Sequence, residues 1–245
     1  MTAHWFKYLE SALPDVETHF ISLEVPEAVP MKMRSALRNR SMLVRRLKVF
    51  PIEAIVRGYI TGSAWSSYQK TGEVNGKKMP EGLQESQEFP EPIYTPSTKA
   101  EQGQHDENIS TEKAVEIVGE KYAKRIEELS LKVYKVARDY AKERGIVIAD
   151  TKFEFGLDEK TDEVVLIDEV LTPDSSRFWS KSTYQIGRGQ DSFDKQYLRD
   201  WLTRNGLKGK DGVEVPEEVA KETSQKYQES FRILTGRSLE ESLKS

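Results

Sequence analysis

Two apolar segments near the middle of the chain carry charged side chains where a protein interior is expected. The first reads IADTKFEFG and ends at Gly156, and the second reads VVLIDEVL. Because side chains alternate along a strand, Asp150, Lys152 and Glu154 share one face of the first segment, opposite its phenylalanines. The turn-forming residues between the two segments predict an antiparallel hairpin. Any fold of this chain must therefore give these charges partners.

The predicted hairpin brings carboxylates together. With a turn centred near Thr161, Glu154 is expected opposite Asp168 and on the same face. Facing carboxylates repel each other, and the apolar run around Asp168 and Glu169 predicts that both are buried, where acids need partners. A magnesium ion takes one or two protein carboxylates and completes its shell with water and phosphate oxygens. We therefore expect a metal site at Glu154 and Asp168, with Lys152 as a point charge for a phosphate or carboxylate.

The less specific alternative is a hairpin whose charged face meets solvent. Surface ion pairs are common and contribute little to stability, so Lys152 would then be an ordinary partner of a neighbouring acid. The apolar surroundings of the second segment favour the metal site over this alternative.

Composition and length exclude several classes of protein. The chain has 245 residues, no cysteine and three histidines, which excludes disulfide frameworks, thiolate zinc sites and cysteine nucleophiles. A net charge of −4 provides no general attraction to nucleic acid or to an anionic membrane surface. No apolar run is long enough to span a bilayer, and the first residues do not resemble a signal peptide. We expect a soluble, cytoplasmic protein with no obligate protein partner.

The order of the expected elements indicates an α+β fold. Strand-like segments cluster in the first part of the chain, at 42–50 and 52–60, and helical patterns dominate the second part. The longest expected helix has an apolar stripe from Ile126 to Tyr140 and ends at Gly145. Residues 73–110 are rich in proline and charge and are expected to be mostly loop.

A second group of polar residues follows the apolar strand in VFPIEAIVRGYITGS. Arg57 stands at the end of that strand, and Ser63 stands where a helix is expected to begin. The free N–H groups and the dipole of a helix start favour an anion, which Arg57 is suited to bind in bidentate fashion. An ordinary capped helix beside a surface arginine is the alternative. In TPDSSR, Asp174 and Arg177 add polar groups at the exit of the second hairpin strand, where loops carry chemistry.

Two of these segments resemble the signatures of a known family. VFPIEAIVRGYITGS and IADTKFEFG are similar to the two signature segments of the SAICAR synthetases, in the same order. GSAWSSYQKTG, ESQEFPEPIYTPSTKAEQGQHDENIS and DEVLTPDSSRFW extend the resemblance to about Trp201, most closely to the fungal single-domain enzymes. The resemblance implies one two-lobed α+β domain. Residues 1–94 would belong to an antiparallel-sheet ATP lobe, and residues 95–245 to a larger lobe for substrate and metal.

The resemblance implies an ATP-dependent ligase of purine (IMP) biosynthesis. Such an enzyme joins L-aspartate to the carboxylate of carboxyaminoimidazole ribonucleotide (CAIR) and yields SAICAR, ADP and phosphate. Its implied cofactors are ATP and Mg²⁺, and its implied partners are these small-molecule substrates. The expected course is formation of an acyl phosphate and attack by the aspartate amine, which asks the protein mainly for positioning and charge neutralisation.

The resemblance also implies roles for residues in the charged hairpin and its neighbours. Glu154 and Asp168 would hold magnesium, and Lys152 would lie near the transferred phosphoryl group or the reacting carboxylate. Asp150 would join Lys152 at the catalytic centre and, with Asp174, would line the imidazole pocket. The phosphate of the nucleotide substrate would be bound by Arg57, Ser63 and Arg177.

Two further segments acquire roles from the same resemblance. The stretch STKAEQGQHDE is similar to a loop that closes over the substrates, and Lys99 and Asp106 are its expected substrate-binding residues. The strand pair around LVRRL is similar to the hinge at the adenine ring of ATP. Backbone groups near Arg45, Arg46 and Leu47 would make those contacts, so their side chains carry little information.

The start of the chain departs from the family pattern. Members begin with a glycine-containing hairpin that covers phosphates, so several dozen residues are expected before MTAHWFKYL. On this pattern Met1 is expected to be an internal methionine and the chain a fragment or a mis-started gene model, with an apolar sheet edge exposed. The alternative to a ligase is an inactive module that binds CAIR or SAICAR. A kinase-like phosphotransferase is disfavoured because no HRD-like or DFG-like segment occurs.

Overall fold

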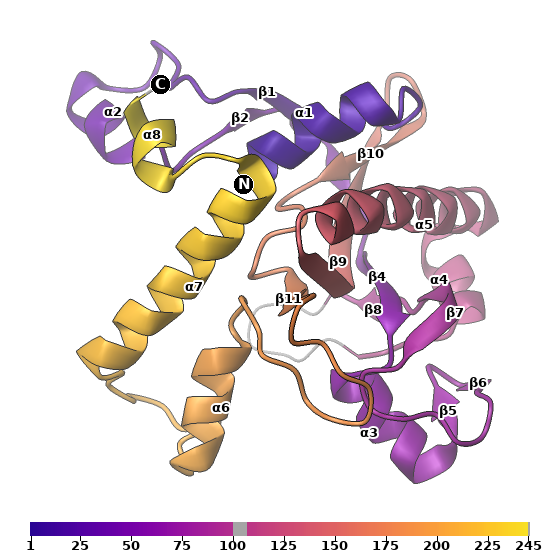
Figure 1. The fold of residues 1–245 in the computed structure, drawn as a ribbon. Coiled ribbons are helices and arrows are strands. Elements are labelled where there is room, and N and C mark those ends of the chain that lie inside the picture. Colours follow the sequence, from indigo (N-terminus) through magenta and orange to yellow (C-terminus); the bar gives the residue numbers. More distant parts are fainter. Residues whose placement is uncertain (100–106, 245) are drawn as a thin grey trace.

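The computed structural model describes residues 1–99 and 107–244 of the chain. Its strands are β1 (Phe20–Ser22), β2 (Leu43–Val44), β3 (Lys48–Val49), β4 (Ile52–Tyr59), β5 (Glu73–Val74), β6 (Lys77–Lys78), β7 (Glu88–Tyr94), β8 (Ser97–Thr98), β9 (Ile146–Asp158), β10 (Glu163–Ile167) and β11 (Ser176–Ser180). Its helices are α1 (Thr2–Ala12), α2 (Met31–Leu37), α3 (Gly62–Thr71), α4 (Thr111–Val118), α5 (Glu120–Glu143), α6 (Gln196–Arg204), α7 (Glu217–Thr235) and α8 (Leu239–Lys244). Figure 1 shows their arrangement.

A seven-stranded antiparallel sheet forms the centre of the molecule. Its main path runs β10–β9–β4–β7, while β3 and β11 also pair with β9 and β8 pairs with β4. Strand β9 contacts four other strands because its thirteen residues exceed the length of any one partner. The antiparallel strands with helices packed against them confirm the predicted α+β class.

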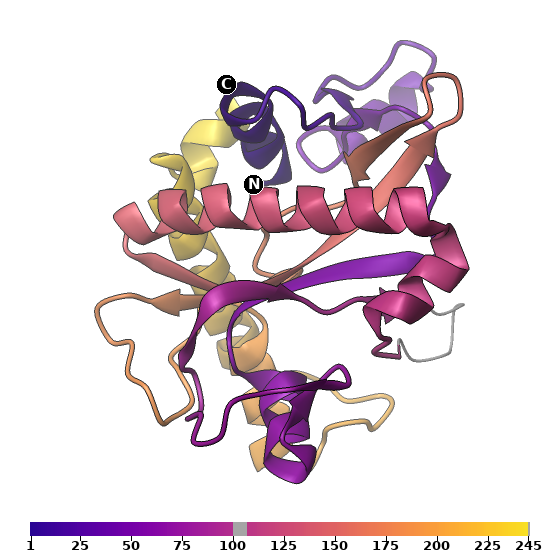
Figure 2. The same ribbon diagram turned by 90° about the vertical axis from the view of Figure 1, so that its right-hand side faces the viewer.

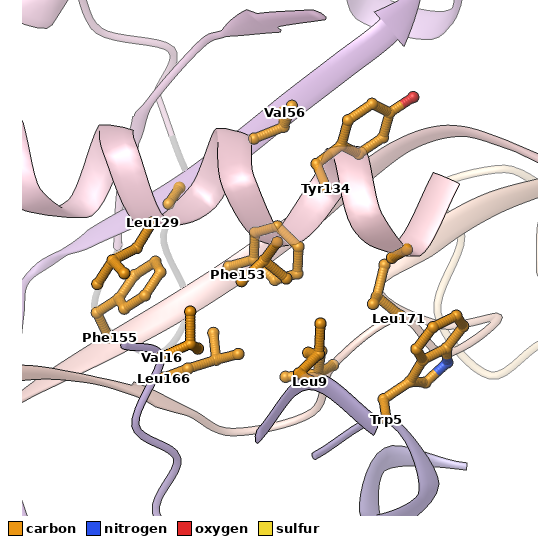
Figure 3. Close-up of a cluster of buried hydrophobic side chains, with 14 of the residues drawn as sticks. Trp5, Leu9, Val16, Val56, Leu129, Tyr134, Phe153, Phe155, Leu166 and Leu171 are labelled. Carbon is orange, nitrogen blue, oxygen red and sulfur yellow. The ribbon is translucent and has the colours of Figure 1, made fainter. Parts of the chain in front are cut away.

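Helix α5 covers one face of the central sheet, whereas α3 and α6 lie on the other side (Figures 1 and 2). The buried residues of α5 recur at helical spacing because one stripe of the helix faces the strands; they include Ala123, Ile126, Leu129, Val133, Ala137 and Ala141. Phe153 and Phe155 of β9 pack beneath this stripe (Figure 3). The opposite face of β9 is therefore directed away from α5, toward the side of α3 and α6.

A close approach between α5 and β4 explains one glycine of the signature segment. The hydroxyl of Tyr134, which is completely buried, donates a hydrogen bond of 2.6 Å to the carbonyl of Ile148. A Cβ atom on Gly58 would lie 1.9 Å from that hydroxyl oxygen. Any side chain at Gly58 would therefore displace Tyr134 and separate the helix from the sheet.

Most described residues of 73–110 are irregular, as predicted, but strands occur among them. This region contains four strands, among them β7, which includes Pro90 and Pro92. Strand β7 ends the main path of the sheet and pairs only with β4 among the described strands, so each proline can direct its missing N–H away from the ladder. Helix α2 also lay outside the sequence prediction.

None of the described helices combines the length and the apolar character needed to cross a bilayer.

Candidate active site

A polar cleft of about 310 Å³ opens on the face of the sheet opposite α5. Its walls come from β4, β9 and β11 and from the beginnings of α3 and α6. Six residues predicted as site residues line it together: Arg57, Ser63, Asp150, Lys152, Asp174 and Arg177. The fold thus unites the two signature segments with TPDSSR, as the sequence analysis expected of one site.

Asp150 is the centre of a buried charge cluster in this cleft. Its Oδ2 atom lies 3.4 Å from Nη1 of Arg57 and 2.5 Å from Nη1 of Arg177. The sheet register explains the contact, because both arginines pair with Asp150 from opposite edges of β9. Burial lowers the pKa of the Arg57 guanidinium, whereas the Asp150 carboxylate raises the pKa of Arg177. One carboxylate shared by two guanidinium groups leaves a net positive charge that suits an anionic ligand.

The beginning of α3 completes this positive end of the cleft. Nη2 of Arg57 donates to Oγ of Ser63 at 3.3 Å, and the helix is capped by Thr61 without a side-chain hydrogen bond. Gly62 has φ of 56°, and a Cβ atom there would lie 2.5 Å from Nη2 of Arg177. The glycine therefore lets a guanidinium approach the helix start. Free N–H groups, a hydroxyl and two guanidinium groups are the donors of a phosphate site.

Lys152 is held by an acid that the sequence analysis did not identify. Its Nζ atom donates to Oε1 of Glu53 at 2.5 Å, and Oγ of Ser97 donates to Oε2 of the same carboxylate at 3.1 Å. Glu53 is only 5% exposed. A single acid within an apolar strand gives no pattern to detect, so only the pairing of β4 with β9 reveals this contact.

Glu154 occupies the next position on the polar face of β9. It is buried, and its Oε2 atom accepts a hydrogen bond from the ammonium of Lys99. Its partner on β10 is Ile167, so the predicted pairing with Asp168 is wrong by one residue. The tight turn causes this shift, because β9 continues to Asp158 and Asp162 adopts φ of 61°. On the other edge of β9, Ala54 of β4 pairs with Phe153.

Asp168 follows the strand rather than forming part of it. Strand β10 ends at Ile167, and Asp168 is exposed with φ of 61°. The predicted burial of Asp168 is therefore wrong, because the chain turns outward where the apolar pattern alone suggested a continuing strand. Glu169 is half-buried and accepts a hydrogen bond of 2.5 Å from the hydroxyl of Thr172.

The far side of the cleft is formed by the loop before β11 and by the start of α6. Asp174 is exposed, and its Oδ1 atom lies 3.2 Å from Nζ of Lys195. Asp194 is only 1% exposed and accepts hydrogen bonds from the backbone of Phe178 at 3.0 Å and of Gln196 at 2.7 Å. Burial raises the pKa of Asp194. The sequence analysis assigned no role to Asp194, Lys195 or Arg199, which all line the cleft.

The predicted adenine hinge lies apart from the lining of this cleft. Arg45 donates to Oε2 of Glu17 at 3.0 Å and to the carbonyl of Thr18 at 2.7 Å, and Arg46 is exposed. Leu47 packs against the end of β9, where a Cβ on Gly156 would lie 2.9 Å from the Leu47 Cβ. In the predicted substrate loop, Lys99 contacts Glu154, and Asp106 lies outside the described residues.

Comparisons with known proteins relate the chain to one family. A family model described as SAICAR synthetase matches residues 1–216. The phosphoribosylaminoimidazole-succinocarboxamide synthase of Saccharomyces cerevisiae is 54% identical over 96% of this chain and 79% of its own length. That of Schizosaccharomyces pombe is also 54% identical, over 95% of this chain and 77% of its own.

Solved structures agree with these sequence relatives. The SAICAR-synthase of Saccharomyces cerevisiae complexed with SAICAR has a TM-score of 0.86 and 52% identity, covering 97% of this chain and 79% of that one. A SAICAR synthetase in complex with ADP has a TM-score of 0.67 and 28% identity, covering 97% of this chain and 78% of that one.

Proposed function

The chain belongs to the SAICAR synthetase family, a family of ligases, and from that premise we propose that it joins L-aspartate to CAIR with consumption of ATP. The observation that carries this proposal is the order of charges in the cleft, where an arginine pair around Asp150 is followed by Lys152 on the same strand face. CAIR carries a phosphate at one end and a carboxylate at the other, which matches that order. A relative with SAICAR bound supports the proposal.

The phosphate of CAIR is proposed to bind at the beginning of α3. There Arg57 and Ser63 already share a hydrogen bond, and Arg177 approaches the backbone at Gly62. In this arrangement Asp150 keeps both guanidinium groups aligned before the ligand arrives, which lowers the entropic cost of binding. The imidazole ring of CAIR would then lie over β9, between Asp150 and Asp174.

The reacting carboxylate of CAIR is proposed to lie at Lys152. Glu53 fixes the ammonium of Lys152, and Ser97 fixes Glu53, so the cation is positioned without any ligand. An ammonium at this point neutralises negative charge on the carboxylate as it is phosphorylated. Asp150 and Lys152 are thus the proposed catalytic pair. Asp150 acts by aligning the two arginines, and Lys152 acts directly on the reacting carboxylate.

Glu154 and Asp168 are the proposed holders of Mg²⁺. Their carboxylates are the hard oxygen donors that the ion prefers, and Asp168 is the residue that follows the Ile167–Glu154 pair. When bound, the ion would neutralise phosphate charge on ATP. Lys99 now pairs with Glu154, so it would have to move toward the substrates when the ion binds.

ATP is proposed to bind with its adenine ring at the segment that contains Arg45, Arg46 and Leu47. This segment joins β2 to β3, and β3 pairs with the end of β9, the strand that carries Glu154. A SAICAR synthetase relative in complex with ADP supports the use of this nucleotide class. In this proposal, residues 1–94 belong to the ATP lobe, and residues 95–245 form the lobe for substrate and metal.

The proposed course has two displacements. First, a carboxylate oxygen of CAIR takes the γ-phosphoryl group of ATP, and ADP leaves. Second, the aspartate nitrogen attacks the acyl carbon, the bond from that carbon to the phosphate oxygen breaks, and phosphate leaves with the oxygen while the amine loses a proton. Both steps depend mainly on alignment and charge neutralisation, which the fixed ion pairs of the cleft supply.

The test uses CAIR labelled with oxygen-18 in its carboxylate. The proposal expects mass spectrometry to find SAICAR and, for each SAICAR formed, one labelled oxygen in the released phosphate. Formation of SAICAR together with unlabelled phosphate would support the ligase activity but contradict the acyl phosphate intermediate. Binding of CAIR without formation of SAICAR would overturn the ligase and favour a binding module.

A further inference from the structure

The short strand β8 and the residue that follows it hold two different carboxylates. The hydroxyl of Ser97 donates to Glu53 at 3.1 Å, and the ammonium of Lys99 donates to Glu154. Both carboxylates are nearly buried, because the side chain of Glu53 is 6% exposed and that of Glu154 is 10% exposed. One short segment therefore supplies partners to acids on two neighbouring strands, β4 and β9.

The two carboxylates differ in how firmly they are held. Glu53 is fixed through both oxygens, since Lys152 donates to Oε1 and Ser97 donates to Oε2. Glu154 forms its ion pair with Lys99, and the side chain of Lys99 is 38% exposed. A lysine is a point charge on a flexible stem, and an ion pair with such an exposed partner is weak. Glu154 is therefore the carboxylate that exchanges its partner more readily.

The backbone that carries Lys99 is fixed, so this exchange requires movement of the side chain alone. The backbone N–H of Lys99 donates to the carbonyl of Pro51 at 3.2 Å. The N–H of Thr98 donates to the carbonyl of Glu107 at 2.9 Å, and the Thr98 hydroxyl accepts from the Glu107 N–H at 3.0 Å. Strand β8 is also paired with β4. The ammonium of Lys99 thus moves about a fixed point beside β9.

A divalent cation and the ammonium of Lys99 require the same carboxylate. Lys99 already places a positive charge on Glu154, so the surroundings of this acid accept a cation. A hard divalent ion coordinates a carboxylate oxygen directly, so the ion and the ammonium exclude each other at Oε2. Lys152 lies two residues from Glu154 on the same face of β9, about 7 Å away. The proposed place of the CAIR carboxylate is therefore the nearest anionic destination for a released Lys99.

We propose that Lys99 and the divalent cation compete for Glu154, and that Lys99 becomes available to the carboxylate of CAIR when the cation binds. This inference rests on the proposed function and adds a regulatory step to the same site. Since each event frees a partner that the other needs, binding of the cation and binding of CAIR favour each other, and the coupling is reciprocal. The ion pair between Lys99 and Glu154 thus acts as a switch between metal and substrate.

The first test measures metal binding by the full 245-residue chain without nucleotide. Mn²⁺ is the probe, its free concentration is measured by electron paramagnetic resonance, and Mg²⁺ is the competitor. In Lys99→Met the dissociation constant for Mn²⁺ should fall at least about fivefold, which corresponds to an ion pair formed about four-fifths of the time in the wild type. Glu154→Gln should abolish this binding. Lys99 is exposed, so its variant should fold, which circular dichroism checks.

The matched control is Lys48→Met, which removes the same charge beside the same strand. Lys48 pairs in register with Leu157 of β9, and its ammonium contacts the exposed Glu159 at 3.6 Å. This variant should leave the dissociation constant for Mn²⁺ unchanged. An equal gain in Lys48→Met and Lys99→Met would show a general effect of charge and would overturn the competition.

The second test measures the coupling by calorimetric titration of CAIR with and without Mg²⁺, again without nucleotide. In the wild type, saturating Mg²⁺ should lower the dissociation constant for CAIR about fivefold, by the same equilibrium. In Lys99→Met this gain should disappear. A gain that persists in Lys99→Met would assign the coupling to contact between the ion and CAIR, and would overturn the release of Lys99.

Two further results would overturn the inference. One is an unchanged dissociation constant for Mn²⁺ in Lys99→Met, and the other is no Glu154-dependent binding of Mn²⁺ by the wild type. Failure of the ligase is distinguishable, because both tests measure binding without turnover. A chain that shows the coupling but forms no SAICAR with ATP and L-aspartate would retain the switch and contradict the proposed function.

Discussion

The two faces of β9 are both buried, yet they are stabilised in different ways. On the face toward α5, Phe153 and Phe155 pack into the main core and need no specific partner. On the opposite face, Asp150 and Glu154 are nearly as buried and are each held by basic side chains. Burial of a charge is unfavourable unless it is paired. The comparison indicates that one face maintains the fold, while the other keeps charges in place for ligands.

The largest expected effect lies on the polar face. Glu154→Gln keeps the shape of the side chain but removes the charge that the proposed metal site needs, so turnover should fall at least about a thousandfold. Because the change is charge-neutralising and isosteric, the unfolding free energy should change by less than about 1 kcal/mol. Steady-state kinetics and urea unfolding measure the two quantities. Glu163→Gln, at an exposed position of β10, is the control and should change neither.

The apolar face should give the opposite result. Phe153→Ala removes a fully buried ring and should lower the unfolding free energy by about 3–5 kcal/mol, because a cavity remains beneath α5. Urea unfolding measures this loss. Ile186→Ala, at a side chain that is 53% exposed, should cost less than about 1 kcal/mol. A similar cost at both positions would contradict the assignment of the stabilising role to this face.

A smaller effect, and one that depends on added phosphate, is expected from a change at Asp150. In Asp150→Asn the two arginines lose their shared carboxylate, and the unfolding free energy should fall by about 3 kcal/mol because Arg57 is left buried and unpaired. Inorganic phosphate should then stabilise the variant more than it stabilises the wild type. Thermal unfolding at increasing phosphate measures the difference. Equal stabilisation of the variant and the wild type by phosphate would show that the anion binds elsewhere. The control is Asp139→Asn, which removes a carboxylate from an exposed ion pair.

The smallest expected effect concerns a buried polar group outside both faces. His19 is 9% exposed, and burial lowers its pKa from 6.5. Below pH 6.5 the unfolded chain therefore binds more protons than the folded protein at this residue, so stability falls as pH falls. His19→Gln should reduce this slope by at most about 1.4 kcal/mol per pH unit. Urea unfolding between about pH 5 and 7 measures this pH dependence of stability. The same slope in His19→Gln and in the wild type would contradict the claim that His19 is neutral in the folded protein.

The sequence predicted the polar face of β9 because alternation along a strand is a local property. Asp150, Lys152 and Glu154 share that face, as expected, and Arg57 and Arg177 reach it from the neighbouring strands. The register of β10 was predicted wrongly because it depends on turn geometry, and the turn between Asp158 and Glu163 is one residue shorter than the predicted register requires.

Other parts of the site required the tertiary structure. Glu53 lies alone in an apolar strand, and only its contact with Lys152 marks it as a member of the site. Lys195 and Arg199 line the cleft because the beginning of α6 docks on β11 through Asp194. Such contacts join distant segments, and no local pattern encodes them.

The central claim is that the polar face of β9 serves an ATP-dependent ligation. The most direct test is ADP release by the purified 245-residue protein with ATP, magnesium, CAIR and L-aspartate, omitting each in turn. The account predicts release that requires all four components and is lost in Glu154→Gln. Release that continues without CAIR or without L-aspartate, or an unchanged rate in Glu154→Gln, would contradict it.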